Sequence, residues 1–199
     1  AMLMRLAPNP ESSYHRTMPR SGYGRIVEAC KEGYVNGSDL QLDAGAKRKV
    51  LRWFTYGLYA VTAASDGEVS GFTANWLSQA SFDPPLVMVS VERDAHTLGL
   101  IRASGRFAVN VLASGQRELA GHFGKKTEKV GNKLATTPYH LSETGLPVLD
   151  TGLGYVVCQV TDEVEAGDSV ILVGRIIEAG VVQEGQPLTM AEAGFRHAG

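Results

Sequence analysis

Cysteine, excess charge and long apolar runs are all scarce in this chain of 199 residues. Its two cysteines, Cys30 and Cys158, are too few for a disulfide framework and too far apart for a Cys-x-x-Cys site, which favours a cytoplasmic protein. The net charge of −2 leaves no basic excess, so nucleic acid is not an expected partner. No run of about 18 apolar residues could cross a bilayer, so no membrane partner is expected either.

Motifs of several common enzyme classes are also missing. Gly22-x-Gly24 and Gly152-x-Gly154 lack the third glycine and the strand-turn-helix context of a dinucleotide fingerprint, which excludes a Rossmann domain. The five histidines show no metal-ligand spacing, and no Gly-x-Ser-x-Gly nucleophile elbow occurs. We therefore expect neither a metal site nor a hydrolase.

The composition, 44% hydrophobic and 20% charged, gives the chain enough apolar residues for one compact domain. Residues 1–45 contain Pro8, Pro10 and Pro19 among scattered glycines and predict an irregular N-terminal arm. The domain itself is predicted over residues 46–199.

Within that domain the pattern predicts many short strands and few helices, typical of a closed antiparallel barrel. Asp66-Gly67 is a hairpin signal between the first two strands. Residues 124–150 predict a looser crossing. Strands are predicted at 58–64, 68–71, 86–91, 107–112, 155–165 and 170–182, and helices at 47–54, 97–103 and 116–123.

The most informative segment runs from Gly71 to Leu86, where small and polar residues are closed by a double proline. Small residues leave backbone N–H groups accessible, and short side chains such as Thr73 and Asn75 add donors. Such a loop can bind the edge of a planar heterocycle or a phosphate. An ordinary polar loop leading into a strand is the alternative.

The residue order of this segment resembles the flavin reductase-like family of FMN-binding split barrels, which typically has Gly-Met-Thr-Ala-Asn/Ser-x-Phe-x-Ser-Val-Ser-x-x-Pro-Pro-Leu-Val here. Four other segments resemble the family in the same order along the chain. They are residues 54–62, 104–112, 119–123 and 165–174. Each match is weak alone, but five collinear matches are specific.

The resemblance implies a mainly β fold: an FMN-binding split β-barrel, antiparallel and Greek-key-like, with a few short helices. It further implies a homodimer, FMN as cofactor with FAD as a possibility, and NAD(P)H as co-substrate. Because a Rossmann domain is absent, the nicotinamide has to stack directly over the flavin.

The family positions that hold the isoalloxazine edge correspond to Thr73, Ala74, Asn75 and Trp76, and a structural turn is the alternative reading. Gln79 and Ser81 fall where the family often has Ser-x-Ser near the ribityl chain or phosphate, although Gln79 departs from that serine.

The phosphate is expected near the residues that follow the strand 86–91. Ser90, near the end of this strand, and Arg93, His96 and Thr97, which follow it, are the candidates. Thr97 also suits the N-cap of the next helix, where an anion is favoured. His96 could instead be a plain surface histidine. Asn110, a polar residue in an apolar strand, fits either a cofactor contact or a satisfied core amide.

Ser169 departs from the family, because many NADH-using members have histidine in a Gly-Asp-His sequence at this position. Serine can hydrogen-bond a carboxamide but offers no imidazole to the nicotinamide. A nicotinamide contact by Ser169 is therefore a candidate role only.

Three functions remain open from the sequence. The first is an NAD(P)H:flavin oxidoreductase that supplies reduced flavin or electrons to a redox partner protein or an oxygenase. The second, favoured by Ser169, is a flavoredoxin-like carrier whose bound FMN is not reduced directly by NAD(P)H. The third is a barrel that has lost the flavin, which the retained Thr73-Ala74-Asn75 argues against.

Overall fold

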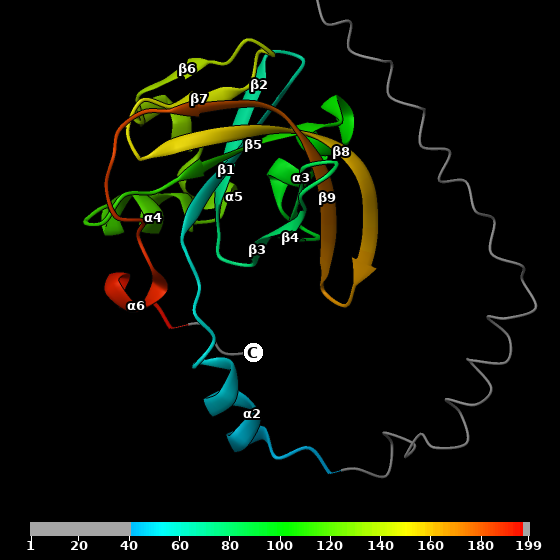
Figure 1. Ribbon diagram of the computed structural model, residues 1–199, viewed down its shortest axis with the longest axis vertical. Coiled ribbons are helices and arrows are strands. Elements are labelled where there is room, and N and C mark those ends of the chain that lie inside the picture. Colours follow the sequence, from blue (N-terminus) through cyan, green and yellow to red (C-terminus); the bar gives the residue numbers. More distant parts are fainter. Residues whose placement is uncertain (1–40, 197–199) are drawn as a thin grey trace, which may run out of the picture. The chain divides into compact units, whose positions relative to one another are not determined.

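The computed structural model describes residues 41–196 (Figure 1). Most of the N-terminal arm predicted at 1–45 therefore lies outside the described residues. The chain divides into two units, residues 1–47 and 48–199, and the barrel belongs to the second. Helix α2 (Ala44–Leu51) begins three residues before the predicted 47–54, because the Asp43 carboxylate accepts hydrogen bonds from the backbone N–H groups of Gly45 and Ala46.

Seven antiparallel strands form one sheet in the order β2-β1-β5-β8-β9-β4-β3. Figure 1 shows the sheet strongly curved, with the long β8 and β9 bending together. The mainly β, antiparallel split barrel predicted from the sequence is thus confirmed. The strands are β1 (Tyr59–Ser65), β2 (Glu68–Ala74), β3 (Leu77–Ser81), β4 (Leu86–Glu92), β5 (Arg106–Val111), β8 (Gly154–Ala166) and β9 (Ser169–Val181).

The hairpin between β1 and β2 follows the sequence signal. Asp66 and Gly67 have φ values of 50° and 79°, the left-handed region that a two-residue turn between twisted strands requires. The turn sets the register of the pair from Ser65 opposite Glu68 to Tyr59 opposite Ala74.

The prediction of one long loop over 71–86 is wrong, because β2 extends to Ala74 and β3 begins at Leu77. Thr73 and Ala74 pair with β1, since a backbone ladder does not require large side chains. β3 lies at the edge of the sheet, so its exposed residues 78–80 show no apolar alternation.

Short helices connect these strands, and a separate two-stranded ribbon lies within the predicted loose crossing. β6 (Tyr139–Leu141) pairs with β7 (Pro147–Leu149). The helices are α3 (His96–Ser104), α4 (Arg117–Phe123), α5 (Thr127–Val130), the 3-10 helix η2 (Lys133–Thr136) and α6 (Met190–Ala193). None of the helices within residues 41–196 is long and apolar enough to cross a membrane.

The largest apolar cluster joins residues of β1, β2, β4, β5, β8 and β9 with α3, which packs against β1 and β2. Leu98 and Ile101 of α3 are almost fully buried with Phe107 of β5. A second cluster joins Leu112, Phe123 and Leu188. Since each of these side chains removes apolar surface from water, they hold the helices firmly on the sheet.

The segment before α6 is bound to the barrel by its backbone. Leu188 is fully buried, its N–H donates to the carbonyl of Leu112 at 2.8 Å, and its carbonyl accepts from the N–H of Leu58 at 2.9 Å. These bonds hold the C-terminal residues beside β1 and β5, so that α6 can contribute to the site.

Candidate functional site

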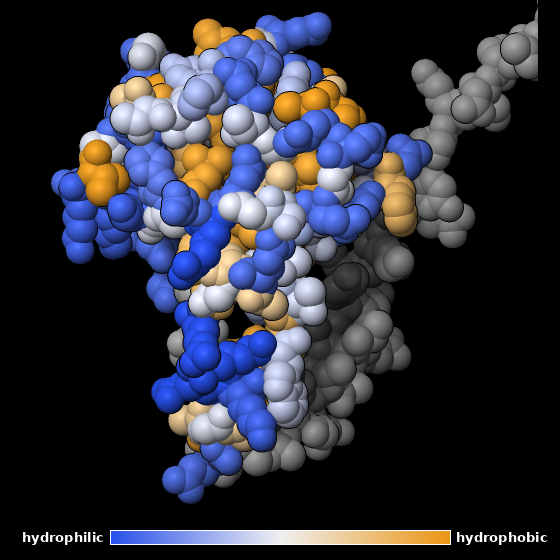
Figure 2. Space-filling view, turned by 90° about the vertical axis from the view of Figure 1, so that its left-hand side faces the viewer, coloured by the Kyte–Doolittle hydropathy of each residue, from blue (hydrophilic) through white to orange (hydrophobic). Residues whose placement is uncertain are grey.

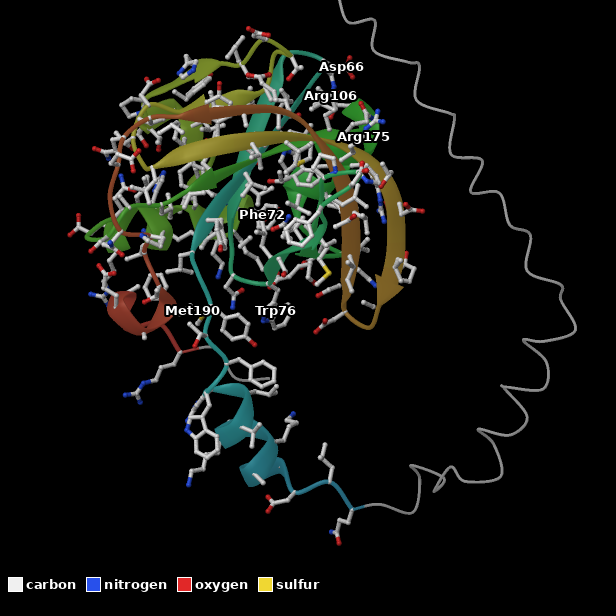
Figure 3. All side chains as sticks on the ribbon, in the orientation of Figure 1. Asp66, Phe72, Trp76, Arg106, Arg175 and Met190 are labelled. Atoms are coloured by element: carbon white, nitrogen blue, oxygen red, sulfur yellow. The ribbon has the colours of Figure 1, made fainter. Side chains whose placement is uncertain are left out.

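A cavity of about 470 Å³ lies at the end of β2, within the size range of small-molecule sites. Its wall combines β2, the start of β9, α3, the α4–α5 region, η2 and the C-terminal segment. Figure 3 labels three of its residues, Phe72 on β2, Trp76 in the link to β3 and Met190 on α6. Residues far apart in the sequence thus meet around one space.

The wall has an apolar component. Phe72, Trp76, Phe123 and Phe195 contribute aromatic rings. Small residues line the cavity as well, namely Ala74, Ala95, Ala120, Gly121 and Gly124. Aromatic rings together with small residues suit a planar ring system that binds by stacking.

Charged groups also line the cavity. The cations are Lys125, Lys126, Lys133 and Arg196, together with His96, and the carboxylates are Glu92, Asp94 and Glu128. The ammonium of Lys126 lies 2.7 Å from the carboxylate of Asp94. Their hydrogen bond and charge attraction lower the pKa of Asp94 and raise the pKa of Lys126. Lysines and an arginine beside an apolar ring site are what a phosphorylated heterocycle requires.

The N-terminal end of α3 lies at the same wall, through Ala95, His96 and Thr97. The prediction that Thr97 caps this helix is wrong, because α3 begins at His96 and Ala95 occupies the N-cap position without a side-chain hydrogen bond. The hydroxyl of Thr97 instead lies 2.9 Å from that of Ser70 on β2. With no side-chain cap, this helix end remains suited to an anion.

His96, predicted as a phosphate contact, lines the cavity but is already paired. Its Nε2 lies 2.7 Å from the carboxylate of Glu68 on β2. This contact fixes the imidazole at the edge of the site and joins α3 to β2.

Thr73 and Asn75 use their side chains to assemble the wall. The hydroxyl of Thr73 donates to the carbonyl of Ala120 on α4 at 2.6 Å. The amide of Asn75 donates to the sulfur of Met190 at 3.1 Å. Both residues line the cavity, and their side chains hold α4 and α6 against the end of β2.

Ser90 and Ser169 also line the cavity, from the adjacent strands β4 and β9. Ser169 is buried, and its hydroxyl donates to the carboxylate of Asp168 at 3.0 Å. Of the twelve residues predicted to contact flavin or nicotinamide, eight line this cavity: Thr73, Ala74, Asn75, Trp76, Ser90, His96, Thr97 and Ser169.

Four predicted residues do not line it. The amide of Gln79 donates to the carbonyl of Ser81 on the exposed edge strand β3, and the guanidinium of Arg93 pairs with Glu165 at 2.5 Å. Asn110 is buried, where its amide donates to the carbonyl of Ala60 and accepts from the N–H of Leu149. The structure therefore favours the core-amide reading of Asn110.

Sequence reasoning missed several wall residues. Lys133 lies in the predicted loose crossing at 124–150, for which the sequence analysis named no site residue, yet it is buried at the cavity wall. The apolar Leu134 that follows it is the one local hint of burial. Met190, Phe195 and Arg196 lie at the site because the C-terminal segment binds to the barrel through contacts with distant residues, which no local sequence pattern predicts.

Within residues 41–196 no group of three or more His, Cys, Asp or Glu side chains could hold a metal ion.

The Flavin reductase like domain family matches residues 51–199 of this chain. The chain belongs to this family.

This flavin reductase-like domain is similar to proteins of different overall length. It is 38% identical over 148 residues to the high molecular weight rubredoxin of Moorella thermoacetica, a match that covers 72% of this chain but only 63% of that protein. It is 32% identical over 136 residues to the reductase subunit HsaB of a flavin-dependent monooxygenase from Mycobacterium tuberculosis, covering 68% of this chain and 71% of HsaB.

A solved structure resembles the domain in fold as well. The NADH:FAD oxidoreductase SgcE6 of Streptomyces globisporus C-1027, in complex with NAD and FAD fragments, has a TM-score of 0.63 and 31% identity. The similarity covers 71% of this chain and 87% of SgcE6.

The wall of the cavity fits a flavin by its chemistry. A flavin needs flat apolar contacts for its ring and positive or N–H groups for its phosphate. The aromatic rings and small residues near β2 supply the first, and the lysines with the end of α3 supply the second.

Proposed function

We propose that this flavin reductase-like domain binds FMN in the cavity at the end of β2 and catalyses hydride transfer from NAD(P)H to flavin. The observation that carries the proposal is the convergence of Thr73 to Trp76 with the N-terminal end of α3 and a lysine-rich wall in one cavity. An oxidoreductase of this kind supplies reduced flavin or electrons to an acceptor.

A bound flavin supplies the hydride acceptor, so the protein needs no acid or base of its own for that step. The aromatic and small residues orient the ring by stacking and close packing. Thr73 and Asn75 hold the wall in place through Ala120 and Met190. The uncapped end of α3 and Lys125 lie where they can attract a phosphate.

The nicotinamide is expected to enter the same cavity, because the sequence carries no Rossmann dinucleotide fingerprint that would bind it elsewhere. Ser169 lines the wall and is the candidate nicotinamide contact. The SgcE6 complex with NAD and FAD fragments supports the binding of both a nicotinamide nucleotide and a flavin, and it keeps FAD as an alternative cofactor.

We further propose an oxygenase or another redox protein as acceptor, which the likeness to a monooxygenase reductase subunit supports. A cytoplasmic homodimer remains part of the proposal.

The second candidate function is a flavoredoxin-like electron carrier, whose bound FMN is reduced by another protein. Ser169 in place of histidine and the likeness to a high molecular weight rubredoxin favour it.

FMN binding tests the cavity directly. Gly121 lines the cavity, and a Cβ there meets only the Phe195 ring at 3.7 Å, so Gly121→Leu should fold while filling the space. We expect saturable quenching of flavin fluorescence by the wild type and an affinity at least about tenfold weaker in the variant.

The matched control is Gly99→Leu on α3. A Cβ at Gly99 has nothing within 4 Å, and this residue does not line the cavity, so the control should bind FMN like the wild type. A wild type that binds no FMN, or a Gly121→Leu variant with unchanged affinity, would contradict the proposal.

A further inference from the structure

Lys133 places an ammonium group inside the cavity wall. The residue is only 4% exposed, although lysines are seldom fully buried. Its Nζ donates to the carbonyl of Gly71 on β2 at 2.8 Å and to the carbonyl of Phe123 at the end of α4 at 3.1 Å. An ammonium has three N–H groups, so these two bonds leave one further donor.

No carboxylate forms an ion pair with Lys133 in the described part of the chain. Burial lowers the pKa of Lys133, and the charge of the exposed Glu128 opposes this shift. The other lysines and the arginine of the wall are exposed, and Lys126 is neutralised by Asp94. Lys133 is therefore the one buried cation among the described residues of the wall.

Burying a charge without an opposite charge costs free energy, which two carbonyl dipoles offset only in part. A negatively charged ligand in the cavity would offset the remaining free-energy cost of burying the Lys133 charge. The Lys133 ammonium lies at the cavity wall, where the dielectric constant is lower than in water. Its charge therefore attracts a negatively charged ligand in the cavity more strongly than a solvent-exposed charge would.

We propose that Lys133 stabilises the reduced form of a flavin bound in this cavity over its oxidised form. The inference rests on the proposed function. Hydride transfer adds two electrons and one proton to the flavin, which gains one negative charge, while the nicotinamide ring becomes a cation. A fixed positive charge in the wall favours the flavin form with the extra electrons.

A purely structural role for Lys133 is the competing explanation, since its two hydrogen bonds join β2 to α4. Two variants separate charge from structure. Lys133→Gln keeps a side-chain donor for the carbonyls without the charge, whereas Lys133→Met removes both. Lys129→Met is the matched control, because Lys129 is exposed on α5 and does not line the cavity.

The experiment measures the dissociation constants of oxidised and anaerobically reduced FMN for each variant, together with the midpoint potential of the bound flavin. We expect the preference for reduced over oxidised FMN to fall by about tenfold or more in both Lys133 variants and to stay unchanged in Lys129→Met. The Tm should fall further in Lys133→Met than in Lys133→Gln, because only the glutamine can still donate a hydrogen bond to the two carbonyls.

A Lys133→Gln variant that binds FMN with the wild-type preference and potential would overturn the inference and leave the proposed function intact. A wild type that binds neither form of FMN would overturn both.

Discussion

At the scale of single residues, Cys158 shows how burial decides reactivity. Its side chain is fully buried in β8, and this burial raises the pKa of the thiol to about 12. Only the thiolate attacks electrophiles, and near pH 8 this pKa leaves a thiolate fraction on the order of 10⁻⁴.

We therefore predict that native Cys158 barely reacts with a thiol reagent at about pH 8. The measurement uses a Cys30→Ser variant, in which Cys158 is the remaining thiol. The same protein unfolded in guanidinium should react fully. Rapid labelling of the folded variant would contradict the burial of this thiol.

Eight of the candidates from the sequence line the cavity, and they lie at the end of β2 and in the link after it, on β4, at the start of β9 and at the start of α3. It could not find Lys133 or Arg196, because their positions depend on contacts with distant segments. Nor could it tell that Asn110 satisfies the backbone of Ala60 and Leu149 in the core.

At the scale of elements, β9 lies close to Cys158 of β8 and to the Phe107 ring of β5 because Gly174 has no side chain. A Cβ at this position would lie 2.8 Å from Cβ of Cys158 and from the ring of Phe107. Gly99 on α3 is the opposite case, exposed and with open space around it.

Gly174→Ala should lower the free energy of unfolding by about 1–3 kcal/mol through overpacking. Gly99→Ala should raise it by about 0.5–1 kcal/mol, because alanine favours the helix. Denaturant titration of both variants measures these changes. Equal stability of the two variants would be incompatible with the described packing of β9.

The α6 segment is held to the turn before α4 by one carboxylate. Glu192 accepts hydrogen bonds from the hydroxyl of Ser114 at 2.7 Å and from the N–H of Gly115 at 2.9 Å. These two bonds, in that order, are the main causes that lower the pKa of Glu192.

A carboxylate with a lowered pKa in the folded state stabilises the fold above its unfolded pKa of roughly 4.3, and this contribution is lost as pH falls through the folded pKa. Glu192→Gln should therefore lower Tm at neutral pH, and the difference from wild type should shrink in acid. Glu118→Gln, an exposed change on α4, serves as the control. A difference in Tm that does not depend on pH would refute this role for the charge.

Local signals sufficed for some elements and failed for others. The β1–β2 hairpin was predictable because an Asp-Gly pair readily adopts the positive φ angles that the turn requires, as Asp66 and Gly67 do. The extension of β2 and the edge strand β3 were not, since their residues are small or polar and are held by pairing with β1 and β4. The strands of the β6–β7 ribbon have three residues each, too few to show a period.

At the scale of the whole molecule, exposed apolar residues are consistent with assembly. Phe82 is 88% exposed and Val181 is 80% exposed. Figure 2 shows one face of the molecule, on which hydrophilic residues predominate and hydrophobic residues form separate groups.

For the whole molecule we predict a homodimer, the commonest symmetric assembly of soluble proteins. Sedimentation equilibrium should give twice the chain mass of 21.3 kDa. A mass of 21.3 kDa at every accessible concentration would exclude the dimer.

The fold as a whole was predictable from the sequence because five collinear segments resemble one family and the family match extends over residues 51–199. The cofactor roles of the cavity residues are still predictions, because they depend on a ligand and not on the packing of the chain alone.

The central claim is that one cavity binds the flavin and admits the nicotinamide that reduces it. The most direct test is an anaerobic titration of the FMN-loaded protein with NADH, and in parallel with NADPH, followed by the flavin absorbance at roughly 450 nm. We predict that one or both nucleotides bleach this band stoichiometrically. A band that persists with both nucleotides yet bleaches with dithionite would contradict the reductase and identify a carrier that receives its electrons from another protein.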